Sequence, residues 1–304
     1  MDWSLYASRQ VKHIMTFDKT AWIAHASTAL FVLLWGSGAI FTRWGLDHAS
    51  AFAFLVLRFA LALTVLLMLG LFRRCWLPAP GTRSTVALTG LLLIGGYSIC
   101  YFLALDHGIT PGLLATLLGV QPILTLMLLE RRFTIMRLLG LVLALGGLVL
   151  IVYQSLAQAR FSPLGMGFAL GALISMTSGA ILQKRIQQAP INVLPLQYVM
   201  SLLLCLAFVP FQPFHIETSL GFMVPLLWLG VVISVVAQLL LYRLIQAGSL
   251  VNVTSLFYLV PAVTALMDYL LLGNALSRQG LLGMAAILAG LALVFKTPTA
   301  ERRR

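Results

Sequence analysis

The chain has 304 residues, of which 61% are hydrophobic and 9% are charged, and its mean hydropathy is +1.00. A soluble domain is about half apolar and roughly a quarter charged, so these few charges could not cover the surface of a soluble protein. The same apolar content excludes intrinsic disorder. The net charge of +12 would suggest a nucleic-acid ligand in a soluble chain, but here it must be read against the apolar segments. The composition therefore indicates a polytopic membrane protein.

Ten apolar stretches approach the length of about 20 residues that an α-helix needs to cross a bilayer. In chain order they are 21–41, 51–72, 86–105, 112–129, 138–153, 164–182, 193–209, 222–242, 250–272 and 280–295. The alternation of about ten residues that is typical of a membrane β-barrel strand is absent. The first stretch is expected to stay as a span, since no small-residue cleavage site follows a short apolar core. The sequence thus predicts an all-α membrane protein with ten transmembrane helices.

Basic residues favour one side of the predicted membrane. If both termini are cytoplasmic, 16 of the 20 Lys and Arg residues fall on cytoplasmic segments. Only Arg43, Arg160 and Arg278 fall on outer loops, and Arg58 lies within the second stretch. This distribution follows the positive-inside rule and fits an even number of spans. We expect a cytoplasmic segment over 1–20 and a basic cytoplasmic tail over 296–304.

The two halves of the chain resemble each other at a nearly constant offset. The matches are Trp35-Gly36-Ser37-Gly38 with Met176-Thr177-Ser178-Gly179 at 141 residues, Pro122 with Pro261 at 139, and Gly140 and Gly147 with Gly283 and Gly290 at 143. Each half, 21–153 and 164–295, holds five spans. Because five is odd, the second copy must enter the membrane from the opposite side, and such inverted repeats recur in secondary transporters. A duplication kept for packing alone is the alternative.

Two matched prolines lie inside spans. Pro122 and Pro261 each remove a helix hydrogen bond and clash with the preceding turn. In a bilayer the freed carbonyl must be satisfied by protein or by water. Two breaks at equivalent depth predict a hinge or a cavity between the halves. A kink without function is the alternative for either proline alone.

Several short motifs recur in order over about 21–296. They are Trp35-Gly36-Ser37, Arg58-Phe59, Ala104-Leu105, Gln121-Pro122, Leu129-Glu130 with Gly140 and Gly147, and then Pro261, Leu272-Gly273-Asn274, Gly283 and Gly290. With these motifs the chain resembles the EamA-type members of the drug/metabolite transporter superfamily. The resemblance implies two inverted five-helix repeats, export of small metabolites from the bacterial cytoplasm, and a cavity lined mostly by spans 1, 3, 4, 6, 8 and 9. Asn274 stands where the family usually has an acidic residue.

Uncharged polar and aromatic residues on those spans are the candidate cavity residues. They are Trp35, Ser37, Tyr97, Tyr101, Gln121, Ser178, Gln238, Tyr242 and Tyr258. A serine in a membrane helix also serves in helix–helix packing, which is its structural alternative. Gln121 and Gln238 are stronger candidates, because a buried amide needs several partners. Aromatic faces with few fixed charges suit amphipathic or zwitterionic metabolites.

Two full charges lie well inside the predicted spans. Arg58 and Asp268 both fall toward the outer side, and charged groups in a bilayer tend to face cavities or partners. We expect them either to pair or to line an outer vestibule, with snorkelling to the headgroups as the alternative. Asp268 is also the candidate for proton coupling, because desolvation favours the protonated carboxyl.

The function expected from these features is secondary active export by alternating access between the repeats. The substrates would be small metabolites, amino acids or related amphipathic compounds, with protons as the candidate coupling ion. No phosphate-binding loop, metal-ligand spacing or catalytic Ser/His/Asp grouping occurs in the sequence, so neither a cofactor nor enzyme activity is predicted. A lipid-linked carrier or flippase of the same fold is the alternative, and an integral-membrane enzyme is a weaker one. The expected location is the bacterial inner membrane. The basic tail fits the anionic cytoplasmic leaflet rather than nucleic acid. Both a monomer and a homodimer fit the sequence.

Overall fold

Helices make up nearly all of the regular structure in the part of the chain that is described. The computed structural model describes residues 26–38, 40–73, 77–130, 133–157, 162–272 and 277–296, except for the side chains of 73, 155, 268, 271 and 272. Within these residues the only β-type pairing is an isolated bridge between Ala49 and Ile216. The predicted segment 1–20, residues 297–304 of the predicted tail 296–304, and Asn274 lie outside the described residues. The all-α prediction is confirmed.

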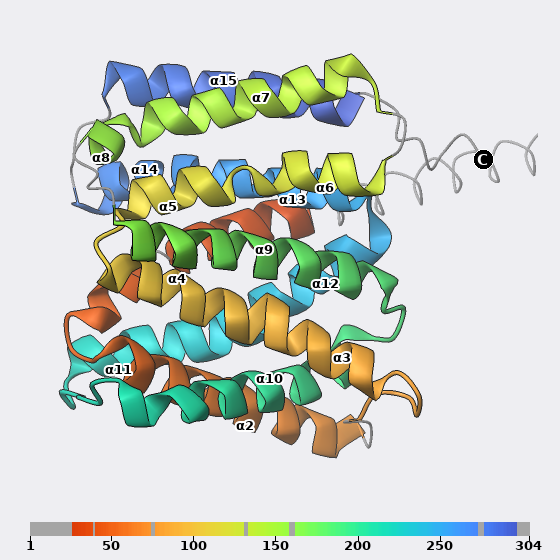
Figure 1. Ribbon diagram of the computed structural model, residues 1–304, viewed down its shortest axis with the longest axis vertical. Helices are drawn as coiled ribbons and strands as arrows, with labels where there is room; N and C mark the ends of the chain where they lie inside the picture. The colour runs from red at the N-terminus through yellow and green to blue at the C-terminus, as the bar shows by residue number, and fades with distance from the viewer. Residues whose placement is uncertain are drawn as a thin grey trace, which may run out of the picture.

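Each half contributes helices in the predicted order (Figure 1). The first half holds the first helix (Ala26–Leu46), α2 (Ala51–Arg73), α3 (Arg83–Gly90), η1 (Leu91–Gly96), α4 (Tyr97–Asp106), α5 (Pro111–Leu118), α6 (Gln121–Leu129), α7 (Ile135–Ile151) and α8 (Tyr153–Ala157). The second half holds α9 (Pro163–Arg185), α10 (Pro190–Phe208), η2 (Val209–Phe211), α11 (Leu220–Leu227), η3 (Trp228–Ala237), α12 (Gln238–Ala247), α13 (Leu250–Ser255), η4 (Leu256–Tyr258), α14 (Leu259–Leu272) and α15 (Arg278–Lys296).

These elements form ten membrane spans. In the described ranges, nine helices are long and apolar enough to cross a membrane, and the 17-residue α7 is the tenth. The first helix ends at Leu46 rather than at 41, and the eighth span continues to Ala247 rather than 242. Both extensions follow from packing, because hydropathy marks where apolar residues end and not where a buried helix ends. Ile245, for example, is 2% exposed in the added turn.

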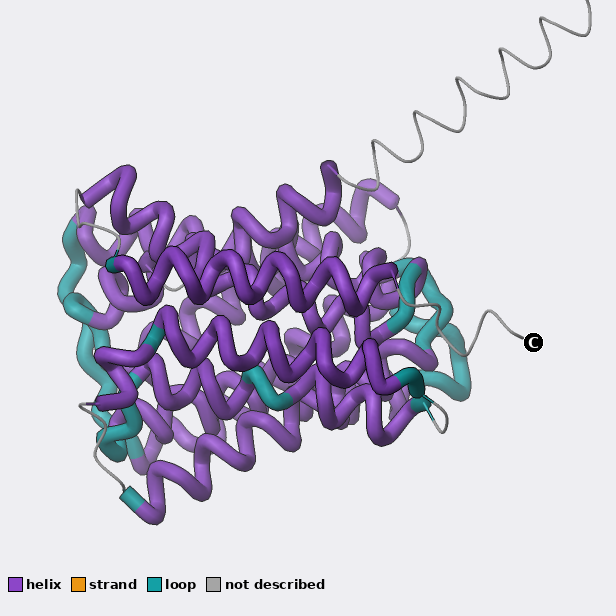
Figure 2. The backbone as a smooth tube through the Cα atoms, turned by 90° about the horizontal axis from the view of Figure 1, so that it is seen from above, coloured by secondary structure: helices purple, strands orange, loops and turns teal. Residues whose placement is uncertain are grey.

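Capping residues set several helix starts. Thr110, Ser162 and Ser219 each accept a hydrogen bond from the backbone N–H three residues later, at Leu113, Gly165 and Phe222. Proline follows directly at the first position of α5 and α9, where its missing N–H is not needed. These local signals place the span ends at the two ends of the bundle, where Figure 2 shows the connecting loops gathered.

The helices α7 and α15 lie side by side along one edge of the bundle (Figure 1). A Cβ atom added at Gly140 would lie 2.7 Å from the Gly290 carbonyl oxygen, and one added at Gly147 would lie 2.5 Å from that of Gly283. Gly140 corresponds to Gly283 in the repeat, and Gly147 corresponds to Gly290. Each of the two contacts therefore becomes the other when the two copies are interchanged. That reciprocity is the mark of a two-fold relation between the copies. The predicted inverted five-helix repeats are confirmed.

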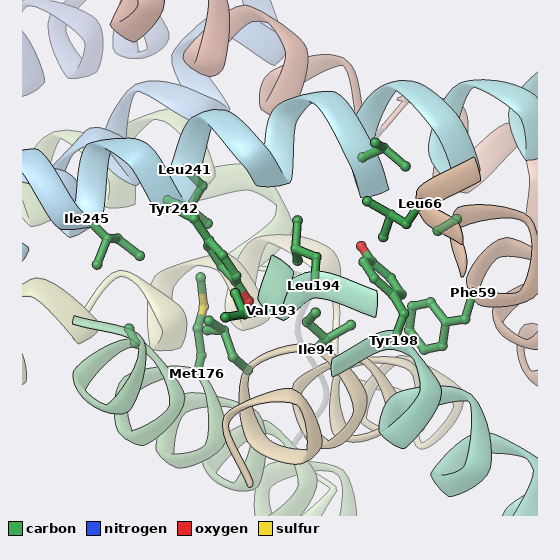
Figure 3. Packing of buried hydrophobic residues seen from close by; sticks show 14 of the residues in the cluster. Phe59, Leu66, Ile94, Met176, Val193, Leu194, Tyr198, Leu241, Tyr242 and Ile245 are labelled. Carbon is green, nitrogen blue, oxygen red and sulfur yellow. The ribbon is translucent and has the colours of Figure 1, made fainter. Parts of the chain in front are cut away.

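The main core lies between the two halves (Figure 3). Its buried side chains come from both copies, among them Phe59, Leu66 and Ile94 from the first and Tyr198 and Leu241 from the second. Large apolar residues such as Ile174 and Leu282 are instead exposed on the outside of the bundle. An apolar lateral surface of this kind suits a lipid environment.

One end of the bundle is called the basic end below. It carries Arg83, Arg137, Lys184, Arg185, Arg243 and Lys296, which lie at the helix ends that the charge distribution predicts to be cytoplasmic. The opposite end carries the loop pairing of Ala49 with Ile216, where the Ser50 hydroxyl also donates to the Pro213 carbonyl at 2.8 Å.

Candidate functional site

Two interrupted helices meet in the interior of the bundle. The fourth span stops at Leu118 and resumes as α6 at Gln121, with Pro122 as the second residue of α6. The ninth span passes from α13 through the 3₁₀ turn η4 into α14, whose third residue is Pro261. Each interruption therefore lies just before the matched proline. Whether the breaks act as hinges stays a prediction.

A hydrogen bond joins the two interruptions. The Tyr258 hydroxyl in η4 donates to the Gly119 carbonyl oxygen at 2.6 Å. Gly119 and Tyr258 are 139 residues apart, the same offset that relates Pro122 to Pro261. Tyr258 was predicted to line a cavity, but it is only 1% exposed and satisfies a carbonyl that the break leaves without a helical partner.

The Trp35-Gly36-Ser37 turn of the first helix packs against α14. The Thr264 hydroxyl donates to the Gly36 carbonyl at 2.9 Å, and a Cβ atom at Gly36 would lie 2.8 Å from Val263. Ser37 is buried, donates to the Leu34 carbonyl at 2.6 Å and accepts from the Trp228 indole at 3.0 Å. The hydrogen-bonding capacity of Ser37 is thus used within the fold.

The predicted cavity residues divide into a buried set and a half-buried set. Ser37, Gln121, Gln238, Tyr242 and Tyr258 are buried, whereas Trp35, Tyr97, Tyr101 and Ser178 are half-buried. The Tyr242 hydroxyl donates to Gln197 Oε1 at 2.6 Å, so it is held inside the core. Tyr97 and Tyr101 share a helix face as predicted, with ring centroids 5.8 Å apart.

Gln121 is a buried polar residue beside the interruption of the fourth span. Its side chain is 2% exposed, and its amide nitrogen has no hydrogen-bond partner among the described residues. A buried donor without a partner is unfavourable by about 1–3 kcal/mol, so such a group usually has a role that compensates. Gln121 lies at the first position of α6, directly beside the interruption.

Arg58 is held in the interior by the second copy. Its Nε donates to the Ser234 hydroxyl at 2.9 Å, and the carbonyl of Ser234 accepts from the Tyr198 hydroxyl at 2.6 Å. Figure 3 shows Tyr198 beside Phe59, the neighbour of Arg58, with ring centroids 5.7 Å apart. The side chain of Asp268 lies outside the described residues, so its predicted pairing with Arg58 stays a prediction.

Two π-helices lie at equivalent places in the copies, and sequence reasoning missed both. They are η1 in the third span and η3 in the eighth, and an offset of 139 residues carries 91–96 into the range of η3. η1 leads directly into Tyr97, while η3 holds Ser234 and leads directly into Gln238. Such π-type turns are frequent at functional sites. Uninterrupted apolar sequence hides them, because hydropathy does not distinguish one helix type from another.

A buried ionic cluster at the basic end was also missed. Arg137 is 0% exposed, and its Nη1 lies 2.7 and 2.8 Å from the two carboxylate oxygens of Glu130. Its Nη2 donates to Ser249 at 3.1 Å and to Asn252 Oδ1 at 2.7 Å. The cluster therefore ties spans 4 and 5 to span 9. The signal was present, since Arg137 is three and seven residues before Gly140 and Ala144 on the buried face of α7.

Further polar contacts join helices of the second copy near the same end. Gln197 donates from Nε2 to Gln183 Oε1 at 2.9 Å, linking α10 to α9. The Lys184 ammonium donates to the carbonyls of Ile245 at 2.8 Å and Gly248 at 2.6 Å, where α12 ends. A cation on the last carbonyls of a helix is favourable because it complements the helix dipole.

A hollow of about 400 Å³ opens at the opposite end. It is lined by Leu46, Ala49, Ser50, Ala51, Phe52, Asp106, Gln212 and Pro213. Within the described part of the chain, no three His, Cys, Asp or Glu residues lie close enough to hold a metal ion. The arrangement thus combines a polar network at one end, an interior with two broken helices, and a hollow at the other end.

Comparisons with known proteins match this architecture. Residues 22–153 and 163–296 each match the EamA-like transporter family. A protein of Salmonella typhimurium named as a probable amino-acid metabolite efflux pump is 27% identical over 283 residues, which cover 86% of this chain and 91% of that protein. Protein PecM of Dickeya dadantii is 26% identical, with 75% of this chain and 79% of that protein covered.

A solved crystal structure has the same fold. It superposes with a TM-score of 0.73 and covers 89% of this chain and 95% of its own chain at 19% sequence identity. At this identity the likeness concerns the arrangement of the helices.

Proposed function

The chain belongs to the EamA-like transporter family, and from this premise we propose that it is a secondary active transporter that exports amino acids or related amphipathic metabolites. It is a multi-pass membrane transporter and not an enzyme, as its family and its similarity to efflux pumps indicate. The amino-acid class is supported by the name of the Salmonella typhimurium relative and by an interior with aromatic rings and few charges. The membrane we propose is the bacterial inner membrane.

The observation that carries the proposal is the contact of Tyr258 with the Gly119 carbonyl. Secondary transporters built from inverted repeats place their substrate sites where interrupted helices meet near the middle of the membrane. Here the two interruptions touch each other through residues that correspond under the repeat. Rocking of one copy against the other would change this contact and alternately open each side.

The two ends of the bundle support a direction for this movement. We take the basic end as cytoplasmic because of its excess of Lys and Arg, with both termini on that side. The Arg137 cluster joins spans 4, 5 and 9 at this end, while the hollow lies at the other. The offset of 143 residues gives Gly280 as the counterpart of Arg137, so the second copy has no guanidinium for a matching cluster. Asp268 is the proposed group for proton coupling.

Transport by the purified full chain tests this function. Proteoliposomes would be loaded with a panel of labelled amino acids and assayed for efflux with and without a pH gradient across the membrane. We expect efflux of at least one amino acid above protein-free liposomes, and a faster rate when the gradient is imposed. Absence of efflux for every amino acid would overturn the proposal. Efflux that requires added lipid-linked sugars would favour a lipid carrier instead.

Two glycine variants test the close approach of the first helix and α14. Gly36→Val places a branched side chain against Val263 and should reduce efflux, because the first helix could no longer lie close to α14. Gly167→Ala lies on α9 with open space around the added carbon and should leave efflux unchanged. Equal efflux by both variants would remove the close approach of the first helix and α14 from the transport cycle.

A further inference from the structure

The guanidinium of Arg58 occupies an interior position between four spans. It is carried by α2, bonded through Nε to Ser234 of η3, and within Coulombic range of the phenol groups of Tyr97 and Tyr198 on spans 3 and 7. Ser234 and Tyr198 are themselves buried. Arg58 is half-buried, and the groups nearest to its guanidinium belong to spans 3, 7 and 8.

The charge of this group has no counter-ion in the described structure. None of the ion pairs among the described residues includes Arg58; they involve Arg137 with Glu130 and two histidines with Glu217. The guanidinium has five N–H donors, and one of them is used by Ser234. A full charge inside a membrane bundle is costly without a partner, and such groups mark substrate or ion pathways.

We propose that Arg58 binds the carboxylate of the transported substrate. The proposal rests on the function proposed above and names the chemical group that the site recognises. With Nε held by Ser234, the two terminal nitrogens remain available as a planar fork, and this fork matches a carboxylate with two parallel hydrogen bonds. The neighbouring Tyr97 and Tyr101 rings offer an apolar surface for the rest of a small amphipathic acid.

The depth of Arg58 fits a route to the hollow. Phe52 lines the hollow and lies six residues before Arg58 on the same helix, which is a rise of about 9 Å. A carboxylate held at Arg58 would therefore sit roughly two helical turns below the hollow. Release toward that end follows the direction proposed for export.

The test compares acids with analogues that lack the carboxylate. Proteoliposomes of the full chain would be assayed for efflux of phenylalanine, leucine and methionine and of the amide of each. We expect the natural protein to prefer the acids. In Arg58→Gln, efflux of the acids should fall about 10- to 100-fold while efflux of the amides changes little, because a charge-assisted pair is lost. Efflux of the acids by Arg58→Lys should lie between that of the natural protein and that of Arg58→Gln, since lysine keeps the charge but not the planar fork.

The outcomes separate this inference from the proposed function. If amino acids are exported but the natural protein shows no preference for acids over amides, the inference is wrong and the proposed function stands. The same holds if Arg58→Gln retains the preference for acids. If no acid or amide is exported, both are wrong. The preferred acid should protect the natural protein against thermal unfolding but should not protect Arg58→Gln. This measurement reports binding even when the variant is folded but transports slowly.

Pairing with Asp268 is the competing explanation for Arg58. The double variant Arg58→Asp with Asp268→Arg would restore transport of the acids if the two side chains form a structural ion pair. Such a rescue would overturn the inference. We expect no rescue, because in our proposal the partner of Arg58 belongs to the substrate.

Discussion

The hydroxyl of Tyr258 lies 2.6 Å from the carbonyl oxygen of Gly119, its counterpart in the other repeat. One copy thus satisfies a backbone group that the other copy leaves unpaired where its helix is interrupted. The same bond ties the fourth span to the ninth, so its strength affects both the stability of the fold and the relative position of the two copies.

Removing this hydroxyl should destabilise the protein. In Tyr258→Phe the buried carbonyl of Gly119 loses its partner, and we expect a loss of about 1–3 kcal/mol in the free energy of unfolding. Thermal unfolding in detergent would measure it as a lower Tm. Tyr153→Phe is the control, because Tyr153 is 50% exposed on α8 and should tolerate the change. Equal Tm values for the two variants would contradict the role assigned to Tyr258.

Breaking the Arg137 cluster should open the basic end. Arg137→Gln leaves the half-buried Glu130 without its main cation, and the loss of one partner of a buried ion pair typically costs about 3–5 kcal/mol. We expect a lower Tm and a larger population open at this end. Arg243→Gln, at the same end but exposed, is the matched control.

Cysteine labelling would report that opening. With the native cysteines replaced, Ser255→Cys introduces a thiol at a site that is 0% exposed, one turn beyond Asn252 on α13. A water-soluble maleimide should label it slowly in the otherwise natural protein and faster after Arg137→Gln. Unchanged labelling in the Arg137→Gln protein would show that the cluster does not control access.

Adjacent glycines on α7 should respond in opposite ways to alanine. A Cβ at Gly147 would lie 2.5 Å from the Gly283 carbonyl oxygen, whereas nothing lies within 4 Å of one at Gly146. We expect Gly147→Ala to destabilise by about 1–3 kcal/mol, because α7 and α15 must move apart. Gly146→Ala should be neutral or slightly stabilising, since alanine favours the helix. A similar loss of Tm in both would mean that the close approach of the helices is unimportant.

Gln121 should show a conflict between stability and transport. Gln121→Leu removes a buried amide nitrogen without a partner, so we expect an unchanged or higher Tm together with reduced efflux. Gln183→Leu is the comparison, because Gln183 also carries an unpartnered nitrogen but accepts from Gln197 through its oxygen. It should lower the Tm. Full efflux by Gln121→Leu would exclude Gln121 from the substrate path.

Hydropathy and spacing predicted the spans, the duplication and the inverted orientation of the second copy. The spans follow from the length of the apolar stretches, and the inversion follows from the odd number of spans in each half. The matched glycines even indicated which helices approach closely, as the contact of Gly140 with Gly290 shows. Partners distant in sequence are different. Tyr258 and Ser37 were predicted to line a cavity, and only the packed structure reveals that their hydroxyls are bonded to the Gly119 carbonyl and to the Trp228 indole.

Arg137 illustrates the same difference for a charge. It was counted among the cytoplasmic charges that define orientation, and its spacing to Gly140 and Ala144 indicates a buried face but not the partners of the charge. Its carboxylate partner is seven residues away, and its amide partner, Asn252, is 115 residues away. A topology rule counts charges on one side of the membrane, whereas the fold decides whether a given charge meets lipid, water or another side chain.

The reciprocal contacts of α7 with α15 also bear on how the two copies are made. Two separate five-span chains could form these contacts only if one were inserted with its N-terminus inside and the other with its N-terminus outside. Joining them through a chain that crosses the membrane ten times fixes the two orientations together. The contact between Gly140 and Gly290 then forms within one molecule. Because both copies belong to one chain, they are always made in equal amounts.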